Sequence, residues 1–240
     1  MKLVFLILFF KFSYLQAHHK IYSPKVEEGR QSFEWRGHFD VDDRNEENKN
    51  HHHVLETEYS WTSVWQSELE FHISDKGDTP LDWEKTEFQN QVQIFDFENF
   101  AAALYFPYNF VTENSEGDEI EYKYLNELYN DELGLITNFI FEKQVGSRAG
   151  GSTTFDLSNY FYIKELFFEL IDFGLIGFSD FGEISKFRVF GEQEHQYGFQ
   201  LESGFELYDI DYEWAIGYLH GLTDASANHT IIWNFEVEFN

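Results

Sequence analysis

Large apolar residues and polar residues alternate one by one over most of this chain. The clearest case is the final stretch, where Ile231, Trp233, Phe235, Val237 and Phe239 occupy every second position. Side chains of a β-strand point alternately to opposite faces, so the pattern predicts a strand with one aromatic–aliphatic and one acidic–polar face. The stretch from 230 to 240 is close to the roughly 9–11 residues that a tilted strand needs to cross a bilayer.

The same alternation recurs about twelve times between residues 32 and 240. Long polar connections are expected at 42–50, 75–82, 114–118, 146–152, 179–193 and 223–228. Tight turns are expected at 62–64, 96–100, 131–134, 164–165 and 208–210. Short periplasmic turns, longer external loops and an even strand number are typical of bacterial outer-membrane barrels. The sequence therefore predicts an all-β fold, a transmembrane antiparallel up-and-down β-barrel of about 12 strands. Proline is nearly absent from the strands, as a hydrogen-bonded ladder requires, with Pro107 as the exception.

Alternation alone does not say which face lies inside. A soluble β-sandwich or lipocalin-like barrel turns its apolar face inward, whereas a membrane barrel does the reverse. The membrane orientation is favoured because one face of nearly every strand carries bulky aromatic residues, too many for a small interior. Tyr and Trp also recur near strand ends, as in aromatic girdles, and the last strand ends close to an aromatic residue, Phe239.

The amino-terminal residues predict export. Met1 and Lys2 are followed by an apolar run, Leu3 to Phe10, and a cleavage site is expected after Ala17. This is the layout of a secretory signal peptide, and Lys11 makes the apolar run too short for a membrane anchor. We therefore expect a signal peptide at 1–17, a periplasmic N-terminal segment at 18–31 and the transmembrane barrel at 32–240.

Composition narrows the function classes. The 240 residues include 44 acidic and 16 basic residues, and the formal net charge of −28 argues against nucleic-acid binding. The chain has no cysteine, which excludes disulfides and thiolate chemistry, and export without cysteine suits a bacterial envelope protein. Aromatic residues make up 20% of the chain, although its mean hydropathy is only −0.45.

With the aromatic face outward, the acidic face lines the lumen. The expected acidic lining is Glu34, Glu56, Glu58, Glu68, Glu70, Glu87, Glu121, Glu202, Glu206, Glu236 and Glu238, with Arg36 and Lys123 as basic partners. So many carboxylates cannot stay ionised in a dry space, because an unpaired buried charge costs several kcal/mol. We expect a passive, porin-like channel for cations or small polar solutes. The alternatives are a barrel plugged by polar side chains, and a structural or adhesive surface barrel acting through loops 42–50 and 179–193.

Histidines are concentrated in the first third of the chain and give a weaker metal hypothesis. The candidates are His18, His19, His51, His52 and His53. Cleavage before Ala17 would make an amino-terminal Cu or Ni site with His19, and imidazole also suits Zn. Consecutive strand residues alternate faces, so His51, His52 and His53 cannot share one ion on a regular strand. The alternative is a solvated histidine-rich loop, with no cofactor at all.

No convincing catalytic constellation is present, so we expect that the protein is not an enzyme. Outer-membrane phospholipase A is a barrel of similar size with a catalytic His and Ser on its lipid-facing side. Here Ser67, Ser203 and His220 are the only candidates on apolar stripes, and the serines are far in sequence from any well-placed histidine.

Two ends of the mature chain carry a family resemblance. The stretches are His18–Pro24 followed by Glu27–Gly29, and Gly217–Leu219 followed by Gly221–Ala225. In these stretches, and in its acidic strands, the chain resembles a group of outer-membrane β-barrel proteins of Gram-negative bacteria. The resemblance implies a bacterial outer-membrane location and supplies no activity. The expected partners are outer-membrane lipid and lipopolysaccharide, the barrel assembly machinery through the C-terminal strand, and a small cationic or polar solute. The barrel is expected to be a monomer.

Overall fold

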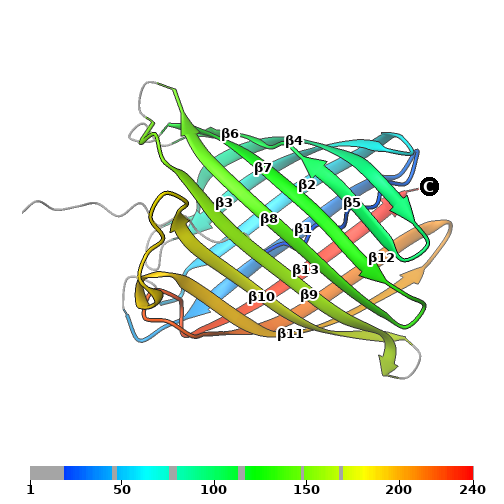
Figure 1. The fold of residues 1–240 in the computed structure, drawn as a ribbon. Coiled ribbons are helices and arrows are strands. Elements are labelled where there is room, and N and C mark those ends of the chain that lie inside the picture. The colour runs from blue at the N-terminus through cyan, green and yellow to red at the C-terminus, as the bar shows by residue number, and fades with distance from the viewer. Residues whose placement is uncertain are drawn as a thin grey trace, which may run out of the picture.

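The computed structural model describes residues 19–44, 48–75, 80–112, 117–146, 149–167 and 170–239. They form one closed antiparallel barrel (Figure 1). The strands are β1 (Gln31–Val41), β2 (His51–Thr62), β3 (Trp65–Asp75), β4 (Asp82–Phe97), β5 (Phe100–Tyr105), β6 (Tyr108–Val111), β7 (Asp118–Tyr129), β8 (Leu133–Val145), β9 (Thr153–Phe167), β10 (Ile171–Glu183), β11 (Glu194–Glu206), β12 (Ile210–Gly221) and β13 (His229–Phe239). One short 3₁₀ helix, η1 (Phe190–Glu192), lies between β10 and β11.

Each strand pairs with its chain neighbours, and the first and last strands close the barrel. Gln31 at the start of β1 lies opposite Phe239 at the end of β13, so both ends of the barrel meet at the end with the tight turns. β5 and β6 are two halves of one barrel strand, because Pro107 between them has no N–H to give to the ladder. The thirteen assigned segments therefore make a 12-stranded barrel, as the sequence predicts.

The connections follow the predicted alternation of long and short, with corrections on both sides of β10, and the long connection expected at 179–193 begins only after Glu183. A turn was expected at 164–165, before an apolar strand 166–178. Instead β9 continues to Phe167, and β10 runs from Ile171 to Glu183. Glu165 has a positive φ of 52°, and pairing between the two strands resumes beyond it at Phe167 and Ile171. Lys164 and Glu165 therefore do not form the turn of this hairpin. The left-handed backbone at Glu165 is an irregularity within β9, and the strand continues beyond it.

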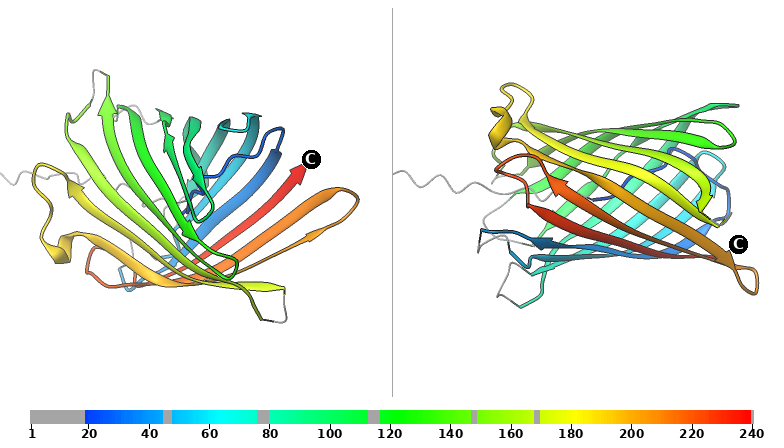
Figure 2. Two further views of the ribbon diagram at one scale, coloured as in Figure 1. Left: turned by 45° about the vertical axis from the view of Figure 1, so that its right-hand side comes forward. Right: turned by 90° about the horizontal axis from the view of Figure 1, so that it is seen from below.

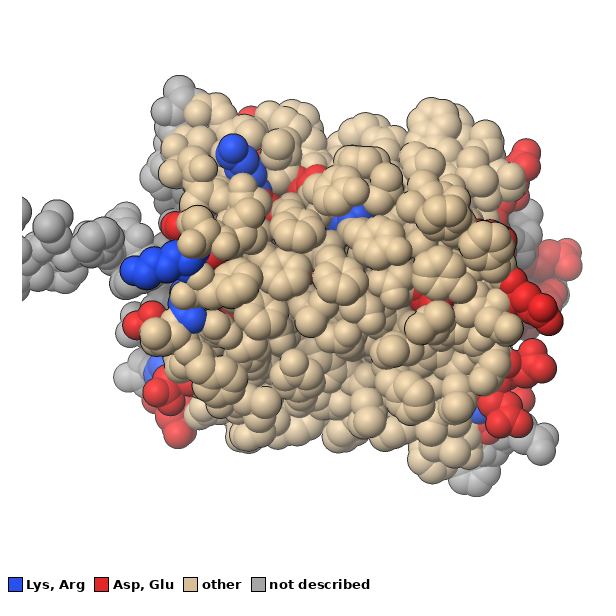
Figure 3. Space-filling model, viewed as in Figure 1, with Lys and Arg blue, Asp and Glu red and all other residues tan. Residues whose placement is uncertain are grey.

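The barrel wall is apolar outside and polar inside, which excludes the soluble alternative. Exposed side chains along the strands are mainly aromatic and aliphatic, such as Trp35, Phe88, Leu175 and Phe199. Viewed from the side, the middle of the barrel is largely free of charge, and Asp, Glu, Lys and Arg gather at its two ends (Figure 3). No helix among the described residues is long and apolar enough to cross a membrane.

Residues 19–26 lie inside the barrel, and residues 27–29 form an exposed turn at the end with the tight turns. The sequence did not predict this position. The expectation for 18–31 was a periplasmic N-terminal segment. In the structure it runs through the interior from the long-loop half toward the start of β1 (Figure 2). Ile21 packs against an interior apolar cluster that includes Ile136 and Phe178, and Tyr22 packs against another with Tyr105 and Leu125. These contacts hold the segment in the lumen, beside the acidic residues of the wall.

Candidate functional site: a filled acidic lumen

Strand register arranges the interior carboxylates in rows around the wall. Glu34 on β1 lies opposite Glu236 on one side and Glu56 on the other, and the pairing continues to Glu70 and Glu87. From β12 to β4 this first row reads Glu213, Glu236, Glu34, Glu56, Glu70 and Glu87. A second row, nearer the tight turns, reads Asp211, Glu238, Ser32, Glu58, Glu68 and Gln89. Like charges directly opposite each other destabilise a sheet, so these rows require cations.

The predicted acidic lining is inside the barrel with one exception. Buried interior positions are taken by Glu34, Glu56, Glu68, Glu70, Glu87 and Glu121. Glu58, Glu202, Glu236 and Glu238 line a cavity in the interior. Glu206 is exposed at the end of β11, beside the tight turn to β12, so it belongs to the rim rather than to the lumen. The alternation assigns Glu206 to the inward face, but β11 ends at this residue. Its carboxylate therefore lies at the open end of the barrel and not in the enclosed lumen.

The two predicted basic partners each serve several carboxylates. The Arg36 guanidinium lies 2.5 Å from Glu34 Oε1 and 2.6 Å from Glu70 Oε2, and it also donates to Glu56. The Lys123 ammonium lies 3.1 Å from Glu121 Oε2. Arg36 therefore neutralises part of the first row, where three consecutive strands each place a glutamate beside it.

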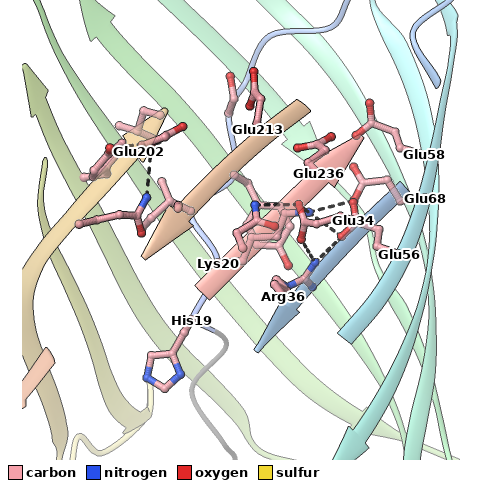
Figure 4. A pocket seen from close by; sticks show the side chains of 18 of the residues that line it. His19, Lys20, Glu34, Arg36, Glu56, Glu58, Glu68, Glu202, Glu213 and Glu236 are labelled. Carbon is pink, nitrogen blue, oxygen red and sulfur yellow. Dashed lines mark hydrogen bonds and ion pairs between the residues drawn. The ribbon is translucent and has the colours of Figure 1, made fainter. Parts of the chain in front are cut away.

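The N-terminal segment supplies a further cation at the centre of the acids. Lys20 Nζ lies 2.5 Å from Glu56 Oε2, 3.4 Å from Glu34 Oε2 and 4.0 Å from Glu68 Oε2. Figure 4 shows its ammonium pointing into this group of carboxylates, next to Arg36. We call Glu34, Glu56 and Glu68 the ammonium cage.

Two more basic residues of the segment bind carboxylates further along it. Lys25 Nζ lies 3.0 Å from Glu127 Oε2 and over the ring of Tyr129. Arg30 donates to Glu236 at 3.0 Å and to Glu238. The segment thus presents three cationic side chains to an acidic wall.

Polar wall residues hold the backbone of the segment. Asn138 accepts from the Tyr22 N–H at 2.8 Å and donates to the Tyr22 carbonyl at 2.9 Å. Gln93 accepts from the Val26 N–H at 2.9 Å, and Gln91 donates to the Ser23 carbonyl at 3.1 Å. A fully extended chain of about twelve residues reaches at most roughly 40–43 Å, more than the roughly 30 Å hydrocarbon thickness of a bilayer.

A cavity of about 290 Å³ remains beside the segment. Its wall includes Glu202, Glu213 and Glu236, together with Lys20 and Arg30 of the segment (Figure 4). At about 30 Å³ for each water, the space matches roughly ten water molecules or one small organic solute. The lumen is therefore narrowed to a polar side cavity along this part of the chain.

The histidines separate into an interior row and an exterior pair. His19, His38, His52 and His72 lie inside, with His19 Nδ1 3.2 Å from His38 Nδ1 and His52 Nε2 3.3 Å from His72 Nδ1. By contrast, the rings of His51 and His53 stack with each other on alternate positions of β2, and His53 also packs against Trp35. His51, His52 and His53 therefore do not converge on one ion, as their alternation predicts.

The amino-terminal copper or nickel site stays a prediction, because Ala17 and His18 lie outside the described residues. The imidazole of His19 lies in the lumen, where its Nε2 is 2.7 Å from Gln196 Oε1.

The candidate hydrolase residues do not come together. Ser203 donates to the Leu170 carbonyl, Ser67 donates to Asn90, and His220 lies 3.0 Å from the Asn228 carbonyl. Neither serine forms a hydrogen bond with His220. These three residues therefore do not form a nucleophile–base pair.

Sequence reasoning missed several members of the site. Lys85 and Glu213 stand at inward positions of β4 and β12, so the alternation could have revealed them. Lys20, Lys25 and Arg30 lie in a segment without periodicity, and no local signal places such a segment inside the barrel.

No protein-family model and no curated protein matches the chain. Among solved structures, a KdgM porin aligns with 87% of this chain and 98% of its own, at 10% identity and a TM-score of 0.56. A NanC porin aligns with 87% of this chain and 99% of its own, at 11% identity and a TM-score of 0.57. A bacterial polysaccharide outer-membrane secretin aligns with 88% of this chain and 98% of its own, at 8% identity and a TM-score of 0.51.

These structures share the fold of this chain. Two of them are porins and the third is an outer-membrane secretin. At this low identity the likeness extends to the architecture of the barrel and no further.

Proposed function

We propose that the protein is an outer-membrane channel that admits small organic cations, and that its own N-terminal segment occupies the path. The observation that carries the proposal is the position of Lys20. Its side chain is an alkylammonium ion bound by Glu34, Glu56 and Glu68, so the wall already binds the chemical group of the proposed solute. The inward carboxylate rows continue around half of the barrel, which would favour cations along the path.

Lumen charge also bears on the solute class. One similar structure is a KdgM porin in complex with disordered oligogalacturonate, a chain of acidic sugar units, at 9% identity and a TM-score of 0.55. An acidic sugar chain would meet repulsion from the carboxylate rows of the present barrel. We therefore propose cations rather than acidic oligosaccharides as the solutes.

The experiment is single-channel recording in planar bilayers under a salt gradient, with the full mature chain and with Lys20→Met. Lys20→Met frees the ammonium cage and weakens the hold on the segment. We expect rare cation-selective openings for the wild type, and more frequent openings with stronger cation preference for the variant. Putrescine should block the variant at lower concentration than the wild type. Lys186→Met, at an exposed loop position, is the matched control and should behave as the wild type.

Anion preference in both proteins would overturn the proposal. Absence of any opening in both would favour the second candidate, a closed surface barrel that acts through its loops. The observation in favour of that candidate is the filled lumen itself, in which Asn138, Gln91 and Gln93 hold the segment by its backbone. Contacts with lipopolysaccharide and with the assembly machinery through β13 stay predictions for either candidate.

A further inference from the structure

Three interior clusters bring acidic or imidazole side chains within 4.8 Å of one another among the described residues. They are Glu56–Glu58–Glu68, Glu213–Glu236–Glu238 and Glu70–His72–Glu87. The N-terminal segment supplies Lys20 to the first cluster and Arg30 to the second. No cation from the described part of the segment pairs with the third cluster, which differs from the other two also in containing an imidazole.

The third cluster is built by the register of two adjacent strands. Glu70 on β3 lies directly opposite Glu87 on β4, and His72 follows on the same face of β3. All three side chains are completely buried. Two carboxylates opposite each other repel, so this position is unfavourable unless a positive charge lies between them.

Glu87 is the observation that points to a ligand. Neither of its carboxylate oxygens has a hydrogen-bond donor among the described residues. The nearest ammonium groups, of Lys85 and Lys123, lie 3.6 and 3.8 Å from its oxygens, beyond hydrogen-bonding distance. Lys123 lies closer to Glu121, at 3.1 Å. A buried carboxylate without a hydrogen bond is costly, and a metal ion would satisfy both oxygens.

The distances suit a small divalent ion. His72 Nε2 lies 2.8 Å from Glu70 Oε2 and 3.7 Å from Glu87 Oε2. Tetrahedral bonds of about 2.0–2.1 Å place neighbouring ligand atoms roughly 3.3 Å apart, a spacing that lies between these two distances.

The surroundings also suit metal ligands. Arg36 and Gln89 bind the oxygens of Glu70 and fix its orientation. His72 Nδ1 faces His52 Nε2 at 3.3 Å, and a metal ion would replace the proton shared between His72 Nε2 and Glu70 Oε2.

We propose that Glu70, His72 and Glu87 bind a divalent transition-metal ion, for which Zn²⁺ has the matching ligand preference. One imidazole and two carboxylates are common zinc ligands, and imidazole disfavours Mg²⁺ and Ca²⁺. The ion would link β3 to β4 inside the wall and supply the direct contact to Glu87 that the two ammonium groups, at 3.6 and 3.8 Å, do not make.

The test is equilibrium dialysis of the full mature barrel in detergent against Zn²⁺ alone, with bound metal measured by mass spectrometry. We expect one Zn²⁺ per barrel, and at least tenfold weaker binding in Glu87→Gln and in His72→Gln. Glu213→Gln alters another cluster and His51→Gln an exterior histidine, and both should retain wild-type binding. Folding of each variant is checked by its heat-dependent migration in electrophoresis.

A readout on the wild type covers the case in which the ligand variants do not fold. Co²⁺ should give visible absorption bands of four- or five-coordinate geometry, and Zn²⁺ should remove them by competition. Absence of bound Zn²⁺ and of these bands in the wild type would overturn the proposal. Unchanged affinity in folded Glu87→Gln would also overturn it, as would loss of the site in His51→Gln with retention in His72→Gln.

Discussion

The Lys20 ammonium, on the N-terminal segment inside the lumen, lies 2.5 Å from a carboxylate oxygen of Glu56 on the barrel wall. Glu56 is also bound by Arg36, so two cations share one side chain. The pair joins a segment without regular structure to the most acidic part of the barrel wall. It explains how glutamates opposite one another on β1, β2 and β3 coexist in a closed space.

Removal of the interior guanidinium should cost much of the stability of the barrel. Arg36→Met leaves Glu34, Glu56 and Glu70 without their shared partner, and an uncompensated buried charge costs about 3–5 kcal/mol. The measurement is urea unfolding in lipid vesicles, followed by tryptophan fluorescence. The double variant Arg36→Met/Glu70→Gln should recover part of the loss, because it also removes one of the unpaired charges. Equal stability of Arg36→Met and the wild type would contradict the ionisation of these three carboxylates.

The apolar outer face predicts a penalty that depends on depth. Leu175, near the middle of β10, is 53% exposed, and Leu175→Arg should destabilise the barrel in a bilayer by about 2–4 kcal/mol. Leu207, at the turn between β11 and β12, is 49% exposed, and Leu207→Arg should cost only about 0–1 kcal/mol. Unfolding from vesicles measures both. Equal penalties at the two positions would contradict the transmembrane orientation.

A latch between two long loops predicts acid sensitivity. Asp42 accepts from Arg44 and from the Asn228 N–H, and Arg44 also donates to the carbonyl of Ser226. The Arg44 guanidinium lowers the pKa of Asp42 from 3.8 to about 2. A lowered pKa means that the latch contributes its full stability above about pH 4 and loses it as the pH falls toward 2.

The free energy of unfolding should therefore decrease between pH 4 and pH 2 through this group. Screening at the end of the barrel limits its share to about 1 kcal/mol. Asp42→Asn should remove this share of the acid slope and lower the stability at pH 7. Asp43→Asn, at the exposed neighbouring position, serves as the control and should leave the slope unchanged. An unaltered slope in Asp42→Asn would exclude the latch as its source.

A close contact in the wall predicts the effect of one methyl group. A Cβ at Gly174 would lie 1.9 Å from a ring carbon of Tyr160 on the adjacent strand. Gly174→Ala should therefore destabilise the barrel by about 1–3 kcal/mol, and Tyr160→Leu/Gly174→Ala should recover part of it. Gly191→Ala is the control, because nothing lies within 4 Å of its Cβ position. Thermal unfolding in detergent measures the series, and a neutral Gly174→Ala would contradict the packing of Tyr160 over Gly174.

The sequence by itself determined the wall of this protein. Alternation is a local property, because neighbouring side chains on a strand must point to opposite faces, and residues such as Glu34, Glu56 and Glu236 could be assigned to one face from it. Turn positions followed from the same pattern. The pattern was misleading at two positions. It placed Glu206 in the lumen although β11 ends there, and it predicted a turn at Glu165 although β9 continues through this residue with a positive φ.

Only the tertiary structure decided what fills the lumen. Lys20 is near no carboxylate of the cage in sequence, and barrel closure brings it to Glu56 and Glu68. Residues 19–30 have no periodicity, so no local rule places them inside or outside the barrel. The pairing of Glu70 with Glu87 depends likewise on strand register, which is fixed by hydrogen bonds between strands and not by either strand alone.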